Sequence, residues 1–196
     1  WQLPLPAAAL DWAAAQLPAG ARALLVSPFS SHRLRNWSVA GYAAVIAHAV
    51  RRHNLAVLLC GPPGAYERDF GARIKQTCGV PLLDLIGQDT LPKLLALMAR
   101  ATVVLGPDAG PAHMATMVGT PVIGLYAATR LERSGPYLSR QWCVSRFEQA
   151  ALRFRGRPAE QLPWAEKIEV PGVMELIEPE AVMARLDELL SRPLLP

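Results

Sequence analysis

The stretch that most constrains this chain runs from Leu105 to Tyr126. An apolar run, Thr102–Leu105, leads into it and predicts a buried strand, which breaks at Gly106-Pro107 before a short helix. A second apolar run, Pro121–Leu125, predicts another buried strand directly after that helix. A strand that passes through a glycine-containing turn into a helix places free backbone N–H groups at the carboxyl edge of a parallel sheet, where the helix dipole favours an anion. The stretch therefore predicts a site for phosphate or for a nucleotide sugar.

The turn in this stretch presents Asp108, Gly110 and His113 ahead of a helix that we expect to end near Gly119. Pro111 suits the first helical turn, because its missing N–H has no partner there in any case. A structural interpretation stays open at this point. Asp108 as a helix cap, Gly110 as a turn residue and His113 as a locally satisfied histidine would give the same pattern.

Strands and helices alternate along most of the chain. The predicted strands are Ala23–Val26, Ala56–Leu59, Pro81–Leu85 and the two named above; the predicted helices are Val39–His53 with Ser38 as its cap, Ala65–Thr77, Leu91–Arg100 with Asp89 or Thr90 as its cap, and Pro179–Leu190. The strands are apolar throughout, which indicates a parallel sheet covered by helices on both faces. Right-handed crossovers then give an α/β, Rossmann-like domain.

A ligand crevice in such a fold lies beyond the carboxyl ends of the strands. We expect the segments that follow those ends to converge there: Ser27–Arg35, Gly61–Glu67, Gly87–Thr90 and Gly106–His113.

The remaining segments are less regular. Residues 1–22 predict a lead-in segment with a helix over Ala7–Gln16, ahead of one domain over residues 23–196. Residues 127–137 predict a polar loop, Gln141–Phe147 an edge strand, and 148–172 an irregular excursion. The chain begins with Trp1 rather than Met, from which we expect it to be part of a longer protein.

Charge and composition narrow the class of protein. The net charge is +4, and no Asp or Glu occurs between Asp11 and Glu67, an interval that holds several arginines: Arg22, Arg33, Arg35, Arg51 and Arg52. Such a stretch attracts a phosphorylated ligand, nucleic acid or an anionic membrane, or it forms a solvated surface. No apolar run approaches the ~18–20 residues of a membrane span, which predicts a soluble protein. Three widely spaced cysteines predict a reducing compartment.

Several common catalytic motifs are missing from the sequence. Neither GxGxxG after the first strand nor GxxxxGK[ST] occurs, which disfavours NAD-dependent oxidoreduction and P-loop phosphoryl transfer. GxSxG is absent too, so a hydrolase elbow has no support. The four histidines (His32, His48, His53 and His113) have no carboxylate-rich neighbourhood of metal-ligand type, so we expect no metal site. We also expect no cofactor.

Two blocks carry a family resemblance. The segment SPFSSHRLRNW resembles the loop P-G-x-S-x-x-K-x-W-P in the carboxyl-terminal domain of glycosyltransferase family 9, the ADP-heptose:lipopolysaccharide heptosyltransferases. Pro28 and Ser31 match its spacing, and Arg35 and Trp37 correspond to its Lys and Trp one position later. The later segment is similar to that family's block D-[ST]-G-x-x-H-x-A-x-x-x-G-x-P, matched by Asp108, Gly110, His113, Ala115, Gly119 and Pro121. Weaker similarities, at Thr129–Tyr137 and in the closing helix, extend the resemblance over about residues 23–190.

The chain departs from that pattern at a few positions. Ala109 stands where the family prefers Ser or Thr, so one hydroxyl-to-phosphate hydrogen bond worth about 0.5–1.5 kcal/mol is missing. Arg35 replaces the usual Lys and offers a planar fork instead of a point charge. Arg130 lies near the usual Pro. These departures leave the identity of the sugar open.

The resemblance implies roles for individual residues. Arg35, aided by Ser31, would meet the pyrophosphate, and Glu67 would accept hydrogen bonds from the ribose. Asp108 would bond sugar hydroxyls. His113 would contact phosphate or hold Asp108. The backbone at a few further positions would let phosphate approach the helix: Ala109, Gly110 and Pro111. Arg35, Asp108 and His113 would thus stabilise the donor or its leaving group.

Structural alternatives to these roles remain open. They are an exposed Arg35, a helix-dipole role for Glu67 and a core-side His113. We interpret Trp37 as a packing residue.

The resemblance further implies the donor-binding half of a two-domain GT-B enzyme that performs inverting, metal-independent heptose transfer from ADP-heptose. The general base and the lipopolysaccharide acceptor site would belong to an amino-terminal domain absent from this chain. We then expect a cytoplasmic protein at the inner face of a bacterial inner membrane, with peripheral membrane association and no nucleic-acid partner. Two alternatives stay open: a nucleotide-sugar epimerase-like domain, and a non-enzymatic anion-binding module that uses the basic stretch.

Overall fold

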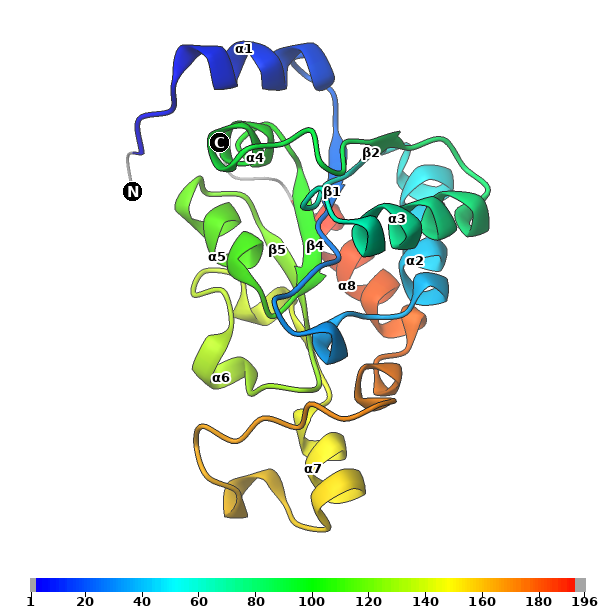
Figure 1. The fold of residues 1–196 in the computed structure, drawn as a ribbon, viewed down its shortest axis with the longest axis vertical. Coiled ribbons are helices and arrows are strands. Elements are labelled where there is room, and N and C mark those ends of the chain that lie inside the picture. The colour runs from blue at the N-terminus through cyan, green and yellow to red at the C-terminus, as the bar shows by residue number, and fades with distance from the viewer. Residues whose placement is uncertain (1–2, 193–196) are drawn as a thin grey trace.

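The computed structural model describes residues 3–192, and a six-stranded parallel sheet forms its centre (Figure 1). The strand order is β3-β2-β1-β4-β5-β6. The strands are β1 Ala23–Val26, β2 Ala56–Leu59, β3 Leu83–Asp84, β4 Val103–Pro107, β5 Val122–Tyr126 and β6 Val144–Ser145. This order reverses direction between β1 and β4, which is the place where ligands bind in doubly wound sheets. The predicted α/β, Rossmann-like class is confirmed.

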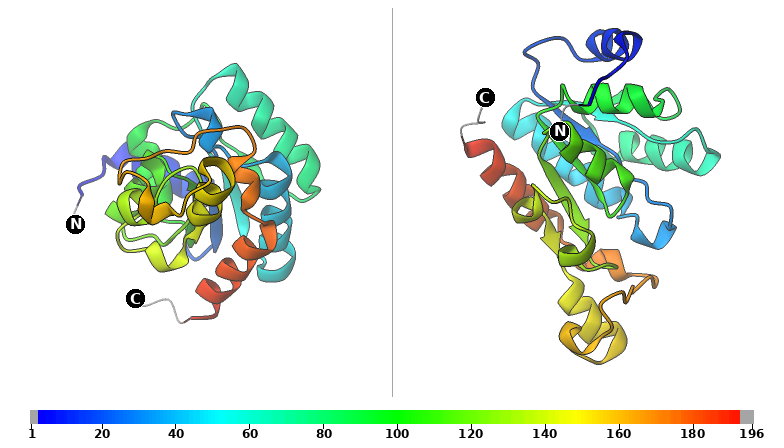
Figure 2. Two further views of the ribbon diagram at one scale, coloured as in Figure 1. Left: turned by 90° about the horizontal axis from the view of Figure 1, so that it is seen from below. Right: turned by 90° about the vertical axis from the view of Figure 1, so that its left-hand side faces the viewer.

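Helices cover both faces of the sheet, as Figure 2 shows. One face packs against α2 Val39–His53, α3 Ala65–Cys78 and α8 Pro179–Ser191, and the other against α1 Ala7–Gln16, α4 Leu91–Met98 and α5 Gly110–Met117. Successive strand residues point to opposite faces, so Leu24 and Val26 join one core while Leu25 joins the other. Both faces are therefore apolar, which explains the uninterrupted apolar strands in the sequence.

The remaining helices are short. They are α6 Leu131–Ser134 and α7 Phe147–Arg155, with 3₁₀ turns over Arg33–Arg35, Arg140–Trp142, Ala159–Gln161 and Val173–Leu176. In Figure 1 the segment around α7 projects away from the sheet at the end opposite α1.

Local sequence signals explain the start of α2. Ser38 caps the helix by accepting a hydrogen bond from the Gly41 amide at 3.0 Å. The buried ring of Trp37 fills the space beside Gly41, where any Cβ would clash with it. The Trp37 indole N–H donates to the Ile177 carbonyl oxygen at 3.1 Å. The capping role predicted for Ser38 and the packing role predicted for Trp37 are both confirmed.

Several predicted boundaries differ from the structure. β4 continues through Gly106-Pro107, because glycine allows the Ser27 carbonyl oxygen to approach its backbone closely. β3 spans only Leu83–Asp84 of the predicted strand, and α4 ends at Met98 rather than Arg100. Thr90 occupies the cap position of α4 but makes no capping hydrogen bond with its side chain.

The segment after β5 differs most from the prediction. The expected edge strand over Gln141–Phe147 reduces to Val144–Ser145, and Phe147 already begins α7. The excursion over 148–172 is thus helical in its first part. Phe147, Ala150 and Ala151 bury one face of α7, a spacing of three and four residues that indicates a helix.

Trp1, Gln2 and residues 193–196, at the outer limits of the predicted lead-in segment and domain, lie outside the described residues. Over residues 3–192, no helix is both long enough and apolar enough to cross a membrane.

Candidate functional site

A cleft of about 750 Å³ opens at the carboxyl edge of the sheet, beside the junction of β1 and β4. The loops after β1, β2 and β4 and the start of α4 line it, so the predicted convergence of these segments is present in the structure. The cleft volume falls in the range of small-molecule sites. All of the predicted binding residues line this cleft: Ser31, Arg35, Glu67, Asp108, Ala109, Gly110, Pro111 and His113.

Arg35 lies in the cleft with its guanidinium held by Glu169. Its Nε donates to Glu169 Oε1 at 2.7 Å and Nη2 lies 2.6 Å from the same oxygen. Nη1 lies 3.6 Å from Asp108 Oδ2. The side chain is 14% exposed, so the alternative of an exposed Arg35 is wrong. A guanidinium this far from solvent is costly unless it is paired or hydrogen-bonded, and Glu169 does both for Arg35.

Glu169 is a site residue that the sequence did not reveal. It follows Ile168, whose amide donates to the Ala128 carbonyl oxygen at 2.8 Å and fixes this segment beside the end of β5. Its second oxygen, Oε2, lies 3.6 Å from His32 Nε2. No motif marks Glu169, because its meeting with Arg35 depends on the path of the excursion after α7.

Asp108 is buried and held from two sides. Its Oδ2 accepts a hydrogen bond from the Ser134 hydroxyl at 3.1 Å, and its backbone carbonyl oxygen accepts one from the Ser30 hydroxyl at 3.1 Å. Ala109, rather than Asp108, is the cap residue of α5. The interpretation of Asp108 as a helix cap is therefore wrong, and its carboxylate faces Arg35 instead.

His113 is exposed on α5 and lines the cleft. The core-side alternative for this histidine is wrong. Among the described residues His113 makes no hydrogen bond to Asp108, whose side chain is held by Ser134. The predicted contact of His113 with phosphate remains a prediction.

Glu67 occupies the first turn of α3, next to Gly64. A Cβ at Gly64 would clash with the Glu67 carboxylate, which therefore lies directly over the backbone of this loop. The neighbouring Tyr66 ring carries the Arg33 guanidinium at 4.2 Å from its centroid. A carboxylate and a cation thus flank the loop after β2.

Asp89 is a further cleft residue, which the sequence suggested only as a helix cap. Its Oδ1 is buried and accepts no hydrogen bond from any residue between 3 and 192. Burial raises the pKa of Asp89, although the amides of Asp89 and Gly61 and the charge of Lys93 act in the opposite direction.

Comparison of the sequence with known protein families identifies the family of this chain. The sequence model of glycosyltransferase family 9 (heptosyltransferase) matches residues 1–162. The chain belongs to this family. It is 38% identical over 166 residues to the lipopolysaccharide core heptosyltransferase OpsX of Haemophilus influenzae, an alignment that covers 85% of this chain and 48% of that protein.

Solved structures share the fold of this family 9 chain. A family 9 glycosyltransferase from Veillonella parvula superposes with a TM-score of 0.72 at 16% identity, over 96% of this chain and 53% of the other. The Escherichia coli ADP-heptose LPS heptosyltransferase II gives 0.68 at 19% identity, with the same coverages of 96% and 53%. The chain thus spans about half the length of these relatives.

Arg130, which lies near a usual proline of family 9, has a structural environment here. Its buried guanidinium donates to the carbonyl oxygens of Ala159 and Leu162, in the second case at 3.1 Å. The same group lies 4.7 Å from the Phe147 ring centroid and 5.7 Å from that of Trp164. Arg130 therefore anchors the excursion around α7 to the end of β5.

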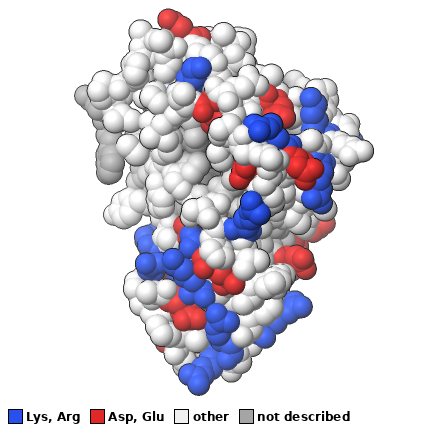
Figure 3. All heavy atoms as spheres, in the orientation of Figure 1, with Lys and Arg blue, Asp and Glu red and all other residues white. Residues whose placement is uncertain are grey.

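The basic stretch does not form one surface in this family 9 chain. Arg33 and Arg35 precede α2 at the cleft, whereas Arg51 and Arg52 lie in the last turn of that 15-residue helix, about 22 Å further along. Figure 3 shows side chains of both signs intermixed over the part of the face where Figure 1 places α6 and α7. A nucleic-acid or membrane surface built from this stretch has no support in the structure.

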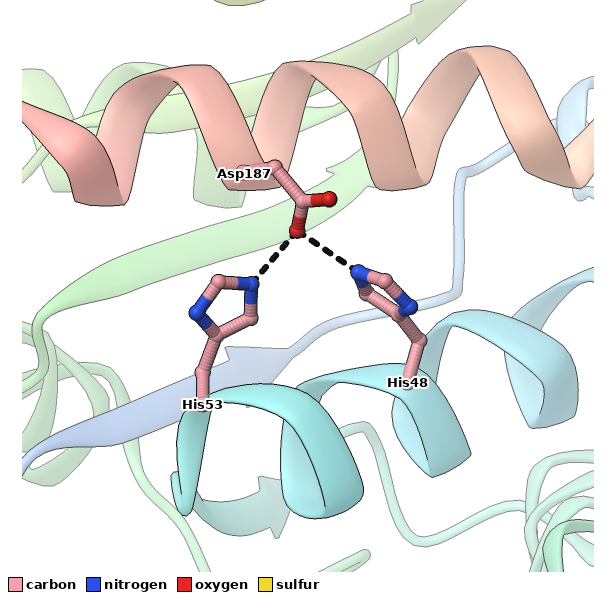
Figure 4. A group of neighbouring side chains, drawn as sticks. All are labelled: His48, His53 and Asp187. Carbon is pink, nitrogen blue, oxygen red and sulfur yellow. Dashed lines mark hydrogen bonds and ion pairs between the residues drawn. The ribbon is translucent and has the colours of Figure 1, made fainter.

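The sequence predicts that no histidine has a neighbourhood suited to metal binding. The structure differs from this prediction at two histidines. His48 and His53 both contact Asp187, which lies on α8 (Figure 4). The sequence could not show this, because more than 130 residues separate the histidines from the carboxylate.

Proposed function

We propose that this chain binds the nucleotide-sugar donor of a glycosyltransferase that moves heptose from ADP-heptose to the inner core of lipopolysaccharide. The observation that carries the proposal is the meeting of Arg35, Glu67 and Asp108 in one cleft at the β1–β4 junction of a family 9 chain. The chain would be the donor half of a GT-B enzyme. The acceptor site and the general base would belong to another domain.

Arg35 is proposed to meet the diphosphate. Its planar fork suits two phosphate oxygens, and it lies at the same cleft as the start of α5. Gly110 begins α5 at the positive end of the helix dipole, although Pro111 has no N–H and the Ala112 amide already donates to the Ala109 carbonyl oxygen at 3.1 Å. Both elements would stabilise the negative charge that develops on the departing ADP.

That charge stabilisation supports transfer without a metal or another cofactor. A cation such as Mg²⁺ commonly neutralises a diphosphate leaving group, and here Arg35 and the helix amides would take that role. The proposed transfer is inverting, with direct attack by the acceptor hydroxyl on the sugar. Closure over the donor would require the second domain.

The other roles follow from the positions of the side chains. Glu67 would accept hydrogen bonds from ribose hydroxyls beside the loop after β2. Asp108 would bond hydroxyls of the sugar, while His113 at the rim would contact phosphate. With lipopolysaccharide as acceptor, we place the protein at the cytoplasmic face of a bacterial inner membrane, in peripheral association.

Calorimetry tests this proposal with the purified protein and three ligands: ADP, ADP-heptose and UDP. We expect both adenine nucleotides to bind and UDP to bind at least about tenfold more weakly, a difference of about 1.4 kcal/mol. Preference for UDP would favour the epimerase-like alternative and contradict the proposed donor. Steep salt dependence on generic DNA would instead favour an anion-binding module.

Asp108→Ala tests the assignment of the sugar contact. The variant should lose the extra affinity for ADP-heptose over ADP while it keeps much of the affinity for ADP. Asp69→Asn is a matched control, because Asp69 is an exposed carboxylate on α3 paired only loosely with Arg73 at 3.9 Å. Equal losses for both ligands in Asp108→Ala would contradict the assigned role.

A further inference from the structure

Two histidines of α2 converge on one carboxylate of α8, as Figure 4 shows. His48 Nε2 lies 2.6 Å from Asp187 Oδ1, and His53 Nε2 lies 2.5 Å from the same atom. The side chains are partly buried, with exposures of 21% for His48, 17% for His53 and 41% for Asp187. The same ring nitrogen of each histidine thus points to a single oxygen.

This cluster lies far from the donor cleft. α2 begins at Val39, just after the cleft loop and its cap Ser38, and His53 is its last residue. Because the helix has 15 residues, its two ends are separated by about 22 Å. A role for the cluster therefore does not depend on the donor, and it belongs to the packing of α8 against α2.

The three groups have the chemistry of a transition-metal site. Two imidazole nitrogens and one carboxylate oxygen lie within 4.8 Å of one another. Zinc is bound by such atoms at about 2.0–2.2 Å, which in a tetrahedral site places ligand atoms roughly 3.3 Å apart. A small outward movement of the partly exposed Asp187 side chain would admit an ion between the three atoms.

A hydrogen-bonded clamp is the simpler explanation, since one carboxylate oxygen can accept two N–H groups. Two details favour a shared ion. Within residues 3–192, the second oxygen of Asp187 accepts no hydrogen bond, so it stays available as a further ligand atom. An open hollow lined by Arg52, Asp187 and Ser191 also adjoins His53, and it gives an ion and its water ligands access.

We propose that His48, His53 and Asp187 bind one divalent transition-metal ion, with zinc as the first candidate, and that the ion ties α8 to α2. The ligand set of two imidazoles and one carboxylate suits zinc and its first-row neighbours, while calcium and magnesium prefer oxygen ligands alone. Water would complete the coordination on the exposed side. The ion would stabilise the fold and take no part in sugar transfer.

Zinc titration of the metal-stripped protein tests the proposal. We expect saturable binding of one zinc per chain. At a free zinc concentration about 100 times the Kd, the Tm should rise by roughly 5–10 °C and return on addition of a chelator. Replacement of zinc by cobalt(II) should give the intense visible absorption of a low-symmetry, tetrahedral site, a readout that needs no variant.

Matched variants locate the ion. His48→Asn and Asp187→Asn should each abolish the zinc-dependent rise in Tm. His113→Asn, which removes an exposed histidine elsewhere, and Glu180→Gln, which removes an exposed carboxylate from the same helix, should keep it. A wild-type protein with no zinc-dependent shift, or a shift that survives in His48→Asn or Asp187→Asn, would overturn the proposal in favour of the hydrogen-bonded clamp.

Discussion

Arg35 carries its charge between two carboxylates, Glu169 and Asp108, before any ligand is bound. A diphosphate that binds Arg35 must share it with these groups or displace one of them. Glu169 holds the guanidinium more closely, at 2.6 Å, whereas Asp108 lies 3.6 Å away. Glu169 occupies two guanidinium donors, Nε and Nη2, that a phosphate would use, whereas Asp108 is also held by the Ser134 hydroxyl. For this reason we expect Glu169 to be the partner that yields when the donor arrives.

Replacement of Glu169 by Gln should strengthen ADP binding. The change removes a negative charge beside the incoming diphosphate and leaves an amide oxygen that can still accept from Arg35. We expect the Kd for ADP to fall about threefold to tenfold at low salt, with a smaller gain at high salt, because charges a few ångströms apart in a partly exposed site interact by about 1 kcal/mol after screening. Calorimetry at two salt concentrations measures this.

Glu166→Gln is the control for that change. Glu166 belongs to the same excursion but pairs with Arg155 at 2.9 Å, away from the cleft. Its replacement should leave the Kd for ADP unchanged. If Glu169→Gln instead weakened ADP binding, Glu169 would be a positioning residue that Arg35 needs during binding.

At the scale of elements, the turn between β3 and α4 holds a carboxyl group in an unfavourable place. Burial raises the pKa of Asp89 in the folded protein. The folded state therefore binds a proton more readily than the unfolded chain does, so ionised Asp89 costs stability above the usual pKa of an aspartate. That cost grows as the pH rises from the usual range through the raised pKa, and it is absent well below both values.

Replacement of Asp89 by Asn should remove this dependence. We expect the Tm of Asp89→Asn to exceed that of the wild type at neutral pH, and the difference to shrink as the pH falls toward the usual range of aspartate. Thermal unfolding at a series of pH values measures it, with Asp69→Asn as an exposed control. A difference that stayed constant with pH would show that charge burial at Asp89 is not its cause.

Elements with strong local signals were predictable from the sequence. The apolar strands β1 and β2, and α2 with its Ser38 cap, have the predicted bounds, because capping and periodicity act over a few residues. α7 was misassigned although its buried face, Phe147, Ala150 and Ala151, follows helical spacing. The arginines in this helix obscured that pattern, and the following prolines suggested an irregular segment.

The cleft was predictable only as far as the sheet determines it. Loops that follow parallel strands must meet at one edge of the sheet, so the sequence predicts that Arg35, Glu67 and Asp108 lie close together. Glu169 and Ser134 could not, because their positions depend on how the chain returns after β5. The contact of Asp187 with His48 and His53 was not predictable either, because it also depends on the path of the chain after β5.

At the scale of the whole molecule, the cleft and the histidine cluster lie in different regions of the fold. The carboxyl edge of the sheet carries the cleft, while the end of α2 carries the histidine cluster, so the proposed donor and the proposed ion occupy separate regions. The chain spans about half the length of its relatives. The open cleft agrees with our proposal that this chain binds the donor and that a second domain completes the site.

The most direct test of the proposed donor site is a crystal structure of the protein with ADP. We predict electron density for the diphosphate between Arg35 and the start of α5, with the ribose hydroxyls within hydrogen-bond distance of Glu67 and with Glu169 turned away from the guanidinium. ADP bound anywhere else, or bound in the cleft without contact to Arg35 and Glu67, would contradict the proposed donor site.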